Sequence, residues 1–209
     1  MAPRNKFSRE EIVRAAFEVV RENGADALTA KAIALRLGVS TRPVFTSLGT
    51  METVRREVSS LAFRYFEDYA EEGLKEDVPF HGFGMRYIGF AREEPELYRL
   101  LFLRPPVGER CGISDTLTRI SERVAPSLVA IYHVTPAQAQ YYFRDLWLVV
   151  HSLATLIVSG ECPYTDREIG QILTDFSVGI CCAIKQIPGF CEGTYDRDAV
   201  FRRLTADGR

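Results

Sequence analysis

The sequence predicts an all-α fold, and three observations lead to that prediction. Capping-box patterns, in which a Ser or Thr is followed three residues later by Glu or Gln, begin at Ser8, Thr135 and Thr165. Apolar residues recur at spacings of three and four along most of the chain, as one face of a helix requires. No segment shows the apolar–polar alternation with a period of two that is typical of a half-buried strand.

The first 73 residues hold four predicted helices in close succession. Each begins at a small polar residue that can cap a helix N-terminus, and each ends at a glycine, which tolerates the left-handed backbone of a helix C-terminus. Pro43 falls in the first turn of the third helix, where its missing N–H does no harm. The capping residues are Ser8, Thr29, Ser40 and Thr50, and the glycines are Gly24, Gly38, Gly49 and Gly73.

The rest of the chain continues as helices. Gly82, Gly84 and Gly89 fall inside one of them, and each costs roughly 1 kcal/mol relative to Ala, so their number indicates close packing or mobility there. Pro126 predicts a kink or a break in another helix. The predicted helices cover residues 80–92, 96–103, 114–132, 136–159, 165–186 and 197–204, with a loop at residues 104–108.

Composition and charge favour a globular protein with a basic N-terminal part. Hydrophobic residues make up 46% and charged residues 26% of the chain, which excludes a disordered protein. Residues 1–50 carry eight Lys/Arg against five Asp/Glu, a net charge of +3, whereas the other 159 residues carry 18 against 23, a net charge of −5. This asymmetry is typical of a small DNA-binding module joined to a domain with another role. We therefore predict two domains, 1–50 and 51–209.

The sequence also favours a cytoplasmic protein without metal or cofactor. It has no run of about 18 apolar residues that would predict a transmembrane helix, and its first residues lack the apolar core of a secretion signal. Five cysteines, an odd number without CxxC spacing, are typical of reduced thiols. No Cys/His/carboxylate cluster predicts a metal site, and no phosphate-binding loop predicts a nucleotide cofactor.

Residues 29–54 have the appearance of a helix-turn-helix. Two short helices meet near Gly38, and the second carries small polar residues and one Arg. Val44 and Leu48 would pack inward, while Arg42 can donate two hydrogen bonds to a guanine. The alternative is an ordinary three-helix bundle without a DNA-binding role, because such a bundle would show the same caps.

The run FSREEIVRAAFEVVRENGADALTAKAIALRLGVSTRPVFTSLGTMETV, residues 7–54, resembles the N-terminal domain of TetR-family transcriptional regulators. The "ALT" entry to the second helix, the "IA..LGVS" turn and the aromatic residue followed by a G-T exit occur in the family's order. The rest of the chain resembles the family in helical layout. The resemblance implies a homodimer that binds a palindromic double-stranded DNA operator, most often as a repressor. A small molecule entering the C-terminal domain would release it.

The resemblance also implies which residues contact DNA. Departures from the family occur at Leu48, where an aromatic residue is common, and at Met51, where a phosphate-binding Lys is common. DNA affinity is therefore expected to be lower, or to depend more on Arg4, Lys6 and Arg9. The predicted DNA-binding residues are Thr29, Lys31, Ser40, Thr41, Arg42, Pro43, Phe45, Thr46 and Ser47.

The helices at about 136–159 and 165–186 are apolar around more than one face, so each must bury a second surface. Gly179 and Ala183, four residues apart, would let two helices approach closely. The resemblance implies that these helices form the homodimer interface, and simple burial in the core of one chain is the alternative.

We expect an unidentified small-molecule ligand to bind among residues 80–92 and their neighbours. Aromatic rings with polar tips are a normal lining for such a site. Core packing is an equally open alternative for each of these residues, and it is favoured for His151. The predicted ligand-binding residues are Phe83, Tyr87, Tyr98, Phe102, Phe143, Trp147 and His151.

Two other functions remain open beside a non-enzymatic ligand-responsive repressor. One is an all-α small-molecule-binding module or enzyme with a weakened or vestigial DNA-binding head, although no nucleophile–base pair or paired carboxylates occur in the sequence. The other is a regulator switched by oxidation of Cys181 or Cys182. A disulfide between adjacent residues would break their helix, so inert thiols are favoured.

Overall fold

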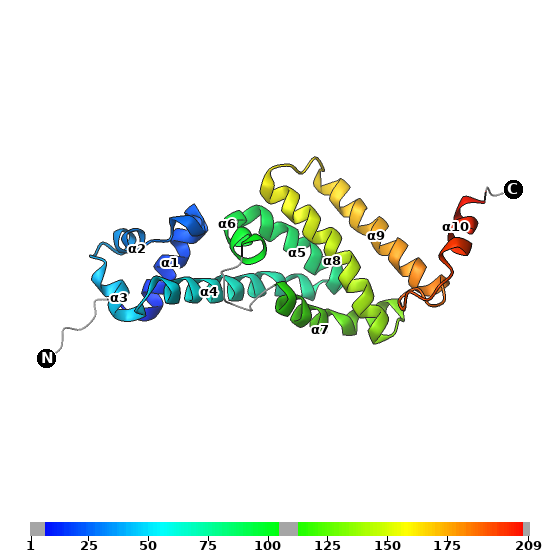
Figure 1. The fold of residues 1–209 in the computed structure, drawn as a ribbon, viewed down its shortest axis with the longest axis horizontal. Helices are drawn as coiled ribbons and strands as arrows, with labels where there is room; N and C mark the ends of the chain where they lie inside the picture. Colours follow the sequence, from blue (N-terminus) through cyan, green and yellow to red (C-terminus); the bar gives the residue numbers. More distant parts are fainter. Residues whose placement is uncertain (1–6, 105–112, 207–209) are drawn as a thin grey trace.

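The structure is a computed structural model that describes residues 7–104 and 113–206. Over these residues it contains ten α-helices, three short helical turns and no β-strand, which confirms the all-α prediction. The molecule is elongated, with a small group of helices at one end and the final helix at the other (Figure 1).

A small N-terminal head is formed by α1 (Arg9–Asn23), α2 (Ala30–Leu37) and α3 (Arg42–Leu48). Helix α4 (Met51–Glu71) begins beside α3 and runs along the long axis of the molecule into the larger body (Figure 1). It packs against α1 and α3 in the head and against α5 in the body. A single continuous helix therefore belongs to both parts.

The body is organised around α8, which packs against α5, α7 and α9. The first turn of α8 is fixed by a reciprocal capping box at Thr135, and its last turn ends at Gly160, whose φ of 77° and ψ of 12° are left-handed. The helices of the body are α5 (Pro79–Glu93), α6 (Pro95–Tyr98), α7 (Ile113–Tyr132), α8 (Pro136–Ser159) and α9 (Asp166–Gln186), followed by α10 (Arg197–Thr205).

Local start and stop signals account for most helix boundaries. The predicted capping boxes at Ser8, Thr135 and Thr165 are all present, with both hydrogen bonds made. The prediction that Ser40 caps the third helix is wrong, because α3 begins at Arg42 with Thr41 at the N-cap position and no side-chain cap. Gly24 has a positive φ of 82° but an extended ψ of 168°, so it turns the chain without continuing α1.

The glycines of α5 are explained by close packing. A Cβ atom on Gly82 would lie 2.1 Å from the carbonyl oxygen of Gly73, so α5 can approach the turn η2 (Gly73–Lys75) only without side chains at these positions. A Cβ on Gly89 would lie 2.9 Å from the Tyr69 hydroxyl of α4. The cost in helix propensity therefore allows α5 to pack tightly against its neighbours.

The structure bears on the predictions for two further helices. Helix α7 is one continuous element that includes Pro126, so of the predicted kink or break the break does not occur. The segment predicted as one helix at 96–103 is divided into α6 and a π-helical turn, η3 (Arg99–Leu103). Most of the predicted loop after Leu103, and Cys111, lie outside the described residues.

Candidate nucleic-acid interface and ligand site

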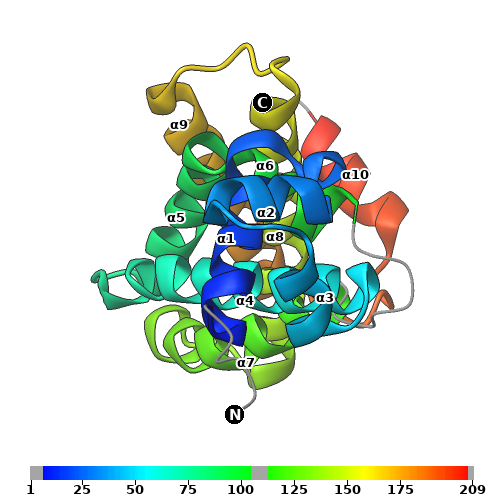
Figure 2. The same ribbon diagram turned by 90° about the vertical axis from the view of Figure 1, so that its left-hand side faces the viewer.

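The head presents α2 and α3 at the outer end of the molecule (Figure 2). Thr29 caps α2 by accepting a hydrogen bond from the backbone N–H of Ala32 at 3.1 Å. Gly38 ends α2 in the left-handed conformation, with φ 65° and ψ 37°, and the Val39 N–H bonds to the Ala34 carbonyl at 3.0 Å. This tight turn sets the angle between the two helices, as in a helix-turn-helix.

The predicted DNA-binding residues lie together on this end of the head. Val44 and Leu48 of α3 are buried, as predicted, and hold the helix against α1 and α4. The side chain of Phe45 is 45% exposed in the single chain, which is a large fraction for an aromatic residue. Thr29, Lys31, Ser40, Thr41, Arg42, Phe45 and Thr46 are exposed, and Pro43 and Ser47 are half-buried.

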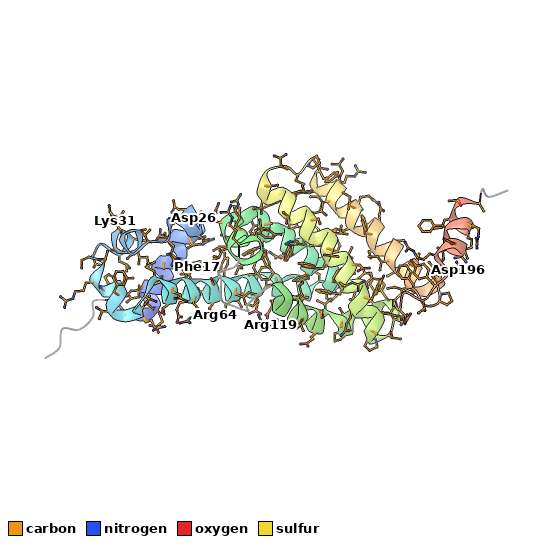
Figure 3. The ribbon with its side chains drawn as sticks, in the orientation of Figure 1. Phe17, Asp26, Lys31, Arg64, Arg119 and Asp196 are labelled. Carbon is orange, nitrogen blue, oxygen red and sulfur yellow. The ribbon has the colours of Figure 1, made fainter. Side chains whose placement is uncertain are left out.

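The cations of the head fall into two groups. Arg9 pairs with Glu57 of α4, and Arg36 makes a bidentate pair with Glu22 at 2.7 and 2.8 Å. Within the described part of the chain, Lys31 and Arg42 have no ion-pair partner, and Figure 3 shows Lys31 on the outer end of the head. Free and exposed cations suit phosphate contacts, whereas paired ones would first have to leave their carboxylates. Arg4 and Lys6, also expected to contribute, lie outside the described residues.

Arg55 and Arg56 were missed by the sequence reasoning. Both are exposed on the second turn of α4, just after the capping residue Thr50. Neither has an ion-pair partner among the described residues. Met51 stands where a Lys was expected, and these two cations lie one turn further along α4.

A buried polar network joins the head to the body. Arg21, near the end of α1, donates from Nε to Glu94 Oε2 at 2.8 Å and pairs through Nη2 with the other carboxylate oxygen. Tyr65 of α4 donates to Glu94 at 3.0 Å, and the Arg21 guanidinium lies 5.3 Å from the Tyr65 ring centre. Glu94, between α5 and α6, is only 6% exposed, so it depends on these partners for solvation.

The predicted ligand-binding residues form a packed aromatic core. Tyr87, Tyr98 and Phe102 lie with ring centres 5.0 to 5.7 Å apart. Trp147 stacks on His151 at 4.8 Å and 20°. The ring centre of Phe83 lies 6.2 Å from that of Tyr87, and the ring centre of Phe143 lies 5.8 Å from that of Phe80. The structure therefore brings five of the seven into one cluster with Phe83 at its edge, whereas Phe143 packs on Phe80 outside it.

His151 provides the polar centre of this cluster. Its Nδ1 atom lies 3.0 Å from the hydroxyls of both Tyr87 and Tyr98, and the Tyr98 hydroxyl also lies 3.2 Å from Thr155 Oγ1. Burial lowers the pKa of His151, so the ring is neutral near pH 7 and can accept a hydrogen bond from a tyrosine. The buried Trp147 Nε1 has no hydrogen-bond partner among the described residues.

A cavity of about 470 Å³ lies elsewhere, between α5, α8 and α9. Tyr142 is central to it: the hydroxyl lies 2.6 Å from Ser177 Oγ, and the ring lies 5.3 Å from both Phe80 and Tyr132. None of the seven predicted residues is among its lining residues. The cavity is lined by Val78, Phe80, His81, Gly84, Tyr132, Tyr142, Leu146, Val150, Leu173, Thr174, Ser177, Val178, Cys181, Cys182, Lys185 and Gln186.

Helix α9 has two distinct surfaces besides the one that packs on α8. Thr174, Val178, Cys181 and Lys185 follow one another at spacings of three and four and face the cavity. Ile172, Phe176, Gly179 and Ala183 repeat with similar spacing on the opposite side. Phe176 is 51% exposed, and a Cβ on Gly179 would meet nothing within 4 Å.

Comparison with known proteins identifies the fold. Residues 80–175, within the body, match the family described as "Tetracyclin repressor-like, C-terminal domain". An uncharacterized HTH-type transcriptional regulator of Mycobacterium tuberculosis is 24% identical over 190 residues, which cover 87% of this chain and 83% of that protein. Together these matches support a TetR-family transcriptional regulator, the family predicted from residues 7–54.

Solved structures agree with this assignment of the regulator's fold. A TetR-like transcriptional regulator from Rhodococcus sp. RHA1 superposes with a TM-score of 0.62 at 14% identity, covering 81% of this chain and 93% of that one. A protein of unknown function from the same organism gives a TM-score of 0.68 at 17% identity, covering 89% of this chain and 100% of that one. At these identities the likeness concerns the fold alone.

Two further properties bear on the regulator's chemistry. Cys162, Cys181, Cys182 and Cys191 are free, and burial raises the pKa of the Cys181 thiol, which disfavours the reactive thiolate. Of the helices described, none combines the length and apolar character needed to cross a bilayer.

Proposed function

We propose that this regulator is a ligand-responsive repressor that binds a palindromic operator as a homodimer in the cytoplasm. The observation that carries the proposal is the exposed end of the head, where the free cations Lys31 and Arg42 accompany a row of small polar residues. Such residues at the N-terminal half of a recognition helix reach base edges and phosphates in the major groove. We keep the domain boundary near residue 50, with α4 as the connection.

In this proposal Arg42, Thr46 and Ser47 contact bases or phosphates, and Thr29 and Lys31 contact the backbone from the start of α2. Ser40, Thr41, Pro43 and Phe45 contribute to the same interface. Arg55 and Arg56 add phosphate contacts in the absence of the usual Lys at Met51. Phosphate contacts give affinity and orientation, while Arg42 supplies discrimination between bases.

The homodimer would form through α8 and α9. The stripe of Ile172, Phe176, Gly179 and Ala183 supports this arrangement. Phe176 and Gly179 are exposed and the other two are half-buried, and an apolar stripe with a glycine at its centre allows close helix packing. Leu148 on α8 is also 53% exposed. Two recognition helices related by a two-fold axis would then match a palindromic operator.

The effector would bind in the body, and we now assign it to the cavity between α5, α8 and α9. The seven aromatic residues predicted from the sequence would then act behind the cavity, as the packed layer that separates it from α6 and the head. The Arg21–Glu94 pair is the contact through which movement of α5 and α6 would reach α1. Ligand binding would favour an arrangement of the heads that does not fit the operator.

A gel-shift experiment tests the DNA-binding part of this function. The purified full-length protein and the DNA fragment upstream of its own gene should form a complex at low salt, and the complex should weaken as salt is raised. An unrelated fragment of equal length is the control. Absence of any complex at low salt would leave the alternative, a small-molecule-binding module or enzyme with a vestigial head, as the better account.

A further inference from the structure

The cavity's charge inventory points to a class of effector. We propose that the ligand is an amphipathic organic anion, whose carboxylate pairs with Lys185 and whose apolar tail lies between α5, α8 and α9. This inference rests on the proposed function in one respect: it takes this cavity as the effector site. The chemistry of the ligand follows from the lining residues alone.

Lys185 is the only permanently charged side chain that lines the cavity among the residues described. The lining contains no Asp or Glu, and Lys185 has no ion-pair partner within the described part of the chain. On the α5 side of the cavity, His81 Nδ1 lies 3.9 Å from a carboxylate oxygen of Glu76. The acidic group nearest this side of the cavity therefore already lies beside a histidine. The cavity therefore offers a cation without a counter-ion at one place, which favours an anionic ligand and repels a cationic one.

Three other polar side chains of the lining already have hydrogen-bond partners. The Tyr142 hydroxyl and Ser177 Oγ bond to each other at 2.6 Å, and Thr174 Oγ1 donates to the Gly170 carbonyl at 2.9 Å. A ligand tail lying over them has no need to supply hydrogen bonds. Lys185 is the exception, since its ammonium group would lose solvation beside a neutral ligand without gaining a partner.

The remaining lining suits an apolar tail. Phe80, Leu146, Val150 and Leu173 are buried side chains that form the wall away from solvent. Tyr132 and Tyr142 extend this wall with ring faces. A cavity of about 470 Å³ lies in the range that proteins use for drug-sized ligands, with mostly apolar walls and a few polar groups that fix orientation. One charged head group and one apolar tail satisfy all of these features.

Binding to the DNA-free, full-length regulator tests this proposal by calorimetry. The probes are dodecanoate, dodecan-1-ol and dodecyltrimethylammonium, which share a tail and differ in head-group charge, each below its micelle-forming concentration. We expect dodecanoate to bind about tenfold more tightly than dodecan-1-ol, as a charged hydrogen bond would provide. We expect the cationic probe to bind more weakly than the alcohol.

Substitutions separate the two parts of the site. Lys185→Met should reduce the affinity for dodecanoate about tenfold and leave that for dodecan-1-ol unchanged, while Lys185→Arg should retain most of the affinity. Leu146→Trp should lower the affinity for both probes, because the larger side chain would fill part of the cavity. Lys75→Met is the matched control, because Lys75 is exposed, pairs with Glu72 and does not line the cavity.

Equal affinity for the acid and the alcohol, no binding of the acid, or an unchanged affinity in Lys185→Met would overturn the proposal. The outcome is independent of operator binding. Lys185-dependent binding without a gel shift would reject the repressor function and keep the ligand class. A gel shift without such binding would do the reverse.

Discussion

Arg42 and Lys31 are free cations in a head where Arg9, Arg21 and Arg36 are paired with carboxylates. Arg36 is paired with Glu22, and Arg21 is bonded to Glu94. The net positive charge of residues 1–50 therefore overstates the charge available to DNA. At the scale of single residues, specificity depends on few side chains, and each should have a measurable effect.

Arg42→Ala should lower operator affinity by about 1–3 kcal/mol, because it removes a side chain able to make a bidentate contact with guanine. Fluorescence anisotropy with a labelled operator, over a range of salt concentrations, measures the change. Arg36→Ala is the control, since its guanidinium already pairs with Glu22, and it should change affinity less. An Arg42→Ala protein with full affinity would show that α3 does not contact DNA in the manner proposed.

His151 makes the stability of the body depend on pH. Its pKa is lowered by burial in the folded state, so the unfolded chain binds the proton more readily. Stability from this residue is present above the ordinary His pKa of about 6.5 and is lost as the pH falls below it.

The wild-type melting temperature should therefore fall more steeply between pH 7 and pH 5 than that of His151→Gln, which cannot be protonated in this range. Thermal unfolding followed by circular dichroism at several pH values measures both slopes. His133→Gln is the control, because His133 is exposed in the turn between α7 and α8. Equal slopes for wild type and His151→Gln would remove the buried ring as a source of pH dependence.

At the scale of helices, the end of α1 is held by the turn between α5 and α6. A Cβ on Gly24 would lie 2.7 Å from a carboxylate oxygen of Glu96, so the chain passes directly over the start of α6. Arg21 and Glu94 form the polar part of the same contact. A substitution at this place should alter the body and the head together.

Arg21→Met should destabilise the protein by about 1–3 kcal/mol, because Glu94 would keep a buried carboxylate without its cation. The Arg21 side chain is 37% exposed, so solvent screens part of the interaction and the lower end of that range applies. The double variant Arg21→Met/Glu94→Gln should recover much of the loss. Urea unfolding gives the free energy of unfolding of the wild type, the two single variants and the double variant, which together form a double-mutant cycle. Additive effects of the two substitutions would contradict a direct coupling between Arg21 and Glu94.

Helices were predictable from the sequence because their signals are local. The capping boxes and terminal glycines act within four residues of the position they mark. The Ser40 prediction was wrong by one residue, because α3 begins at Arg42 without a side-chain cap and the capping signal was therefore no guide to its start. The residues proposed to contact DNA lie together because the turn at Gly38 places them on one end of the head, and their role stays a prediction.

The cavity was not predictable in the same way. An aromatic stripe looks the same whether it faces a core or a cavity, because the difference depends on how closely α9 packs on α8 and α5. The hydroxyls of Tyr87 and Tyr98 lie at hydrogen-bond distance from His151, whereas Tyr142 and Phe80 line the cavity. The sequence did hold one indication of the cavity. Lys185 continues the helical spacing of Val178 and Cys181, so a charged residue shares a face with apolar ones.

At the scale of the whole molecule, the single chain leaves one side of α9 uncovered. The stripe from Ile172 to Ala183, exposed at Phe176 and Gly179, lies opposite the cavity, so dimer formation and ligand binding would use different surfaces of one helix. A ligand that shifts α9 would thereby reach the partner subunit directly. This arrangement makes the oligomeric state testable without disturbing the cavity.

Gly179→Arg should convert the regulator into a monomer that keeps its fold. A Cβ at this position meets nothing within 4 Å in the single chain, and Arg has a higher helix propensity than Gly. Light scattering after size-exclusion chromatography should give 23.6 kDa for the variant and twice that for the wild type. Gln171→Arg, on another exposed part of α9, should remain dimeric, and a dimeric Gly179→Arg would place the interface elsewhere.

Trp147 is the only tryptophan of the chain, and its position makes the protein its own optical probe. Its indole N–H is buried without an acceptor among the described residues, so its fluorescence should lie at the short-wavelength end of the range for this residue. Its ring is stacked on His151, and a protonated imidazole quenches indole emission. The fluorescence of Trp147 should thus report the protonation of His151 in the folded regulator, without any added label.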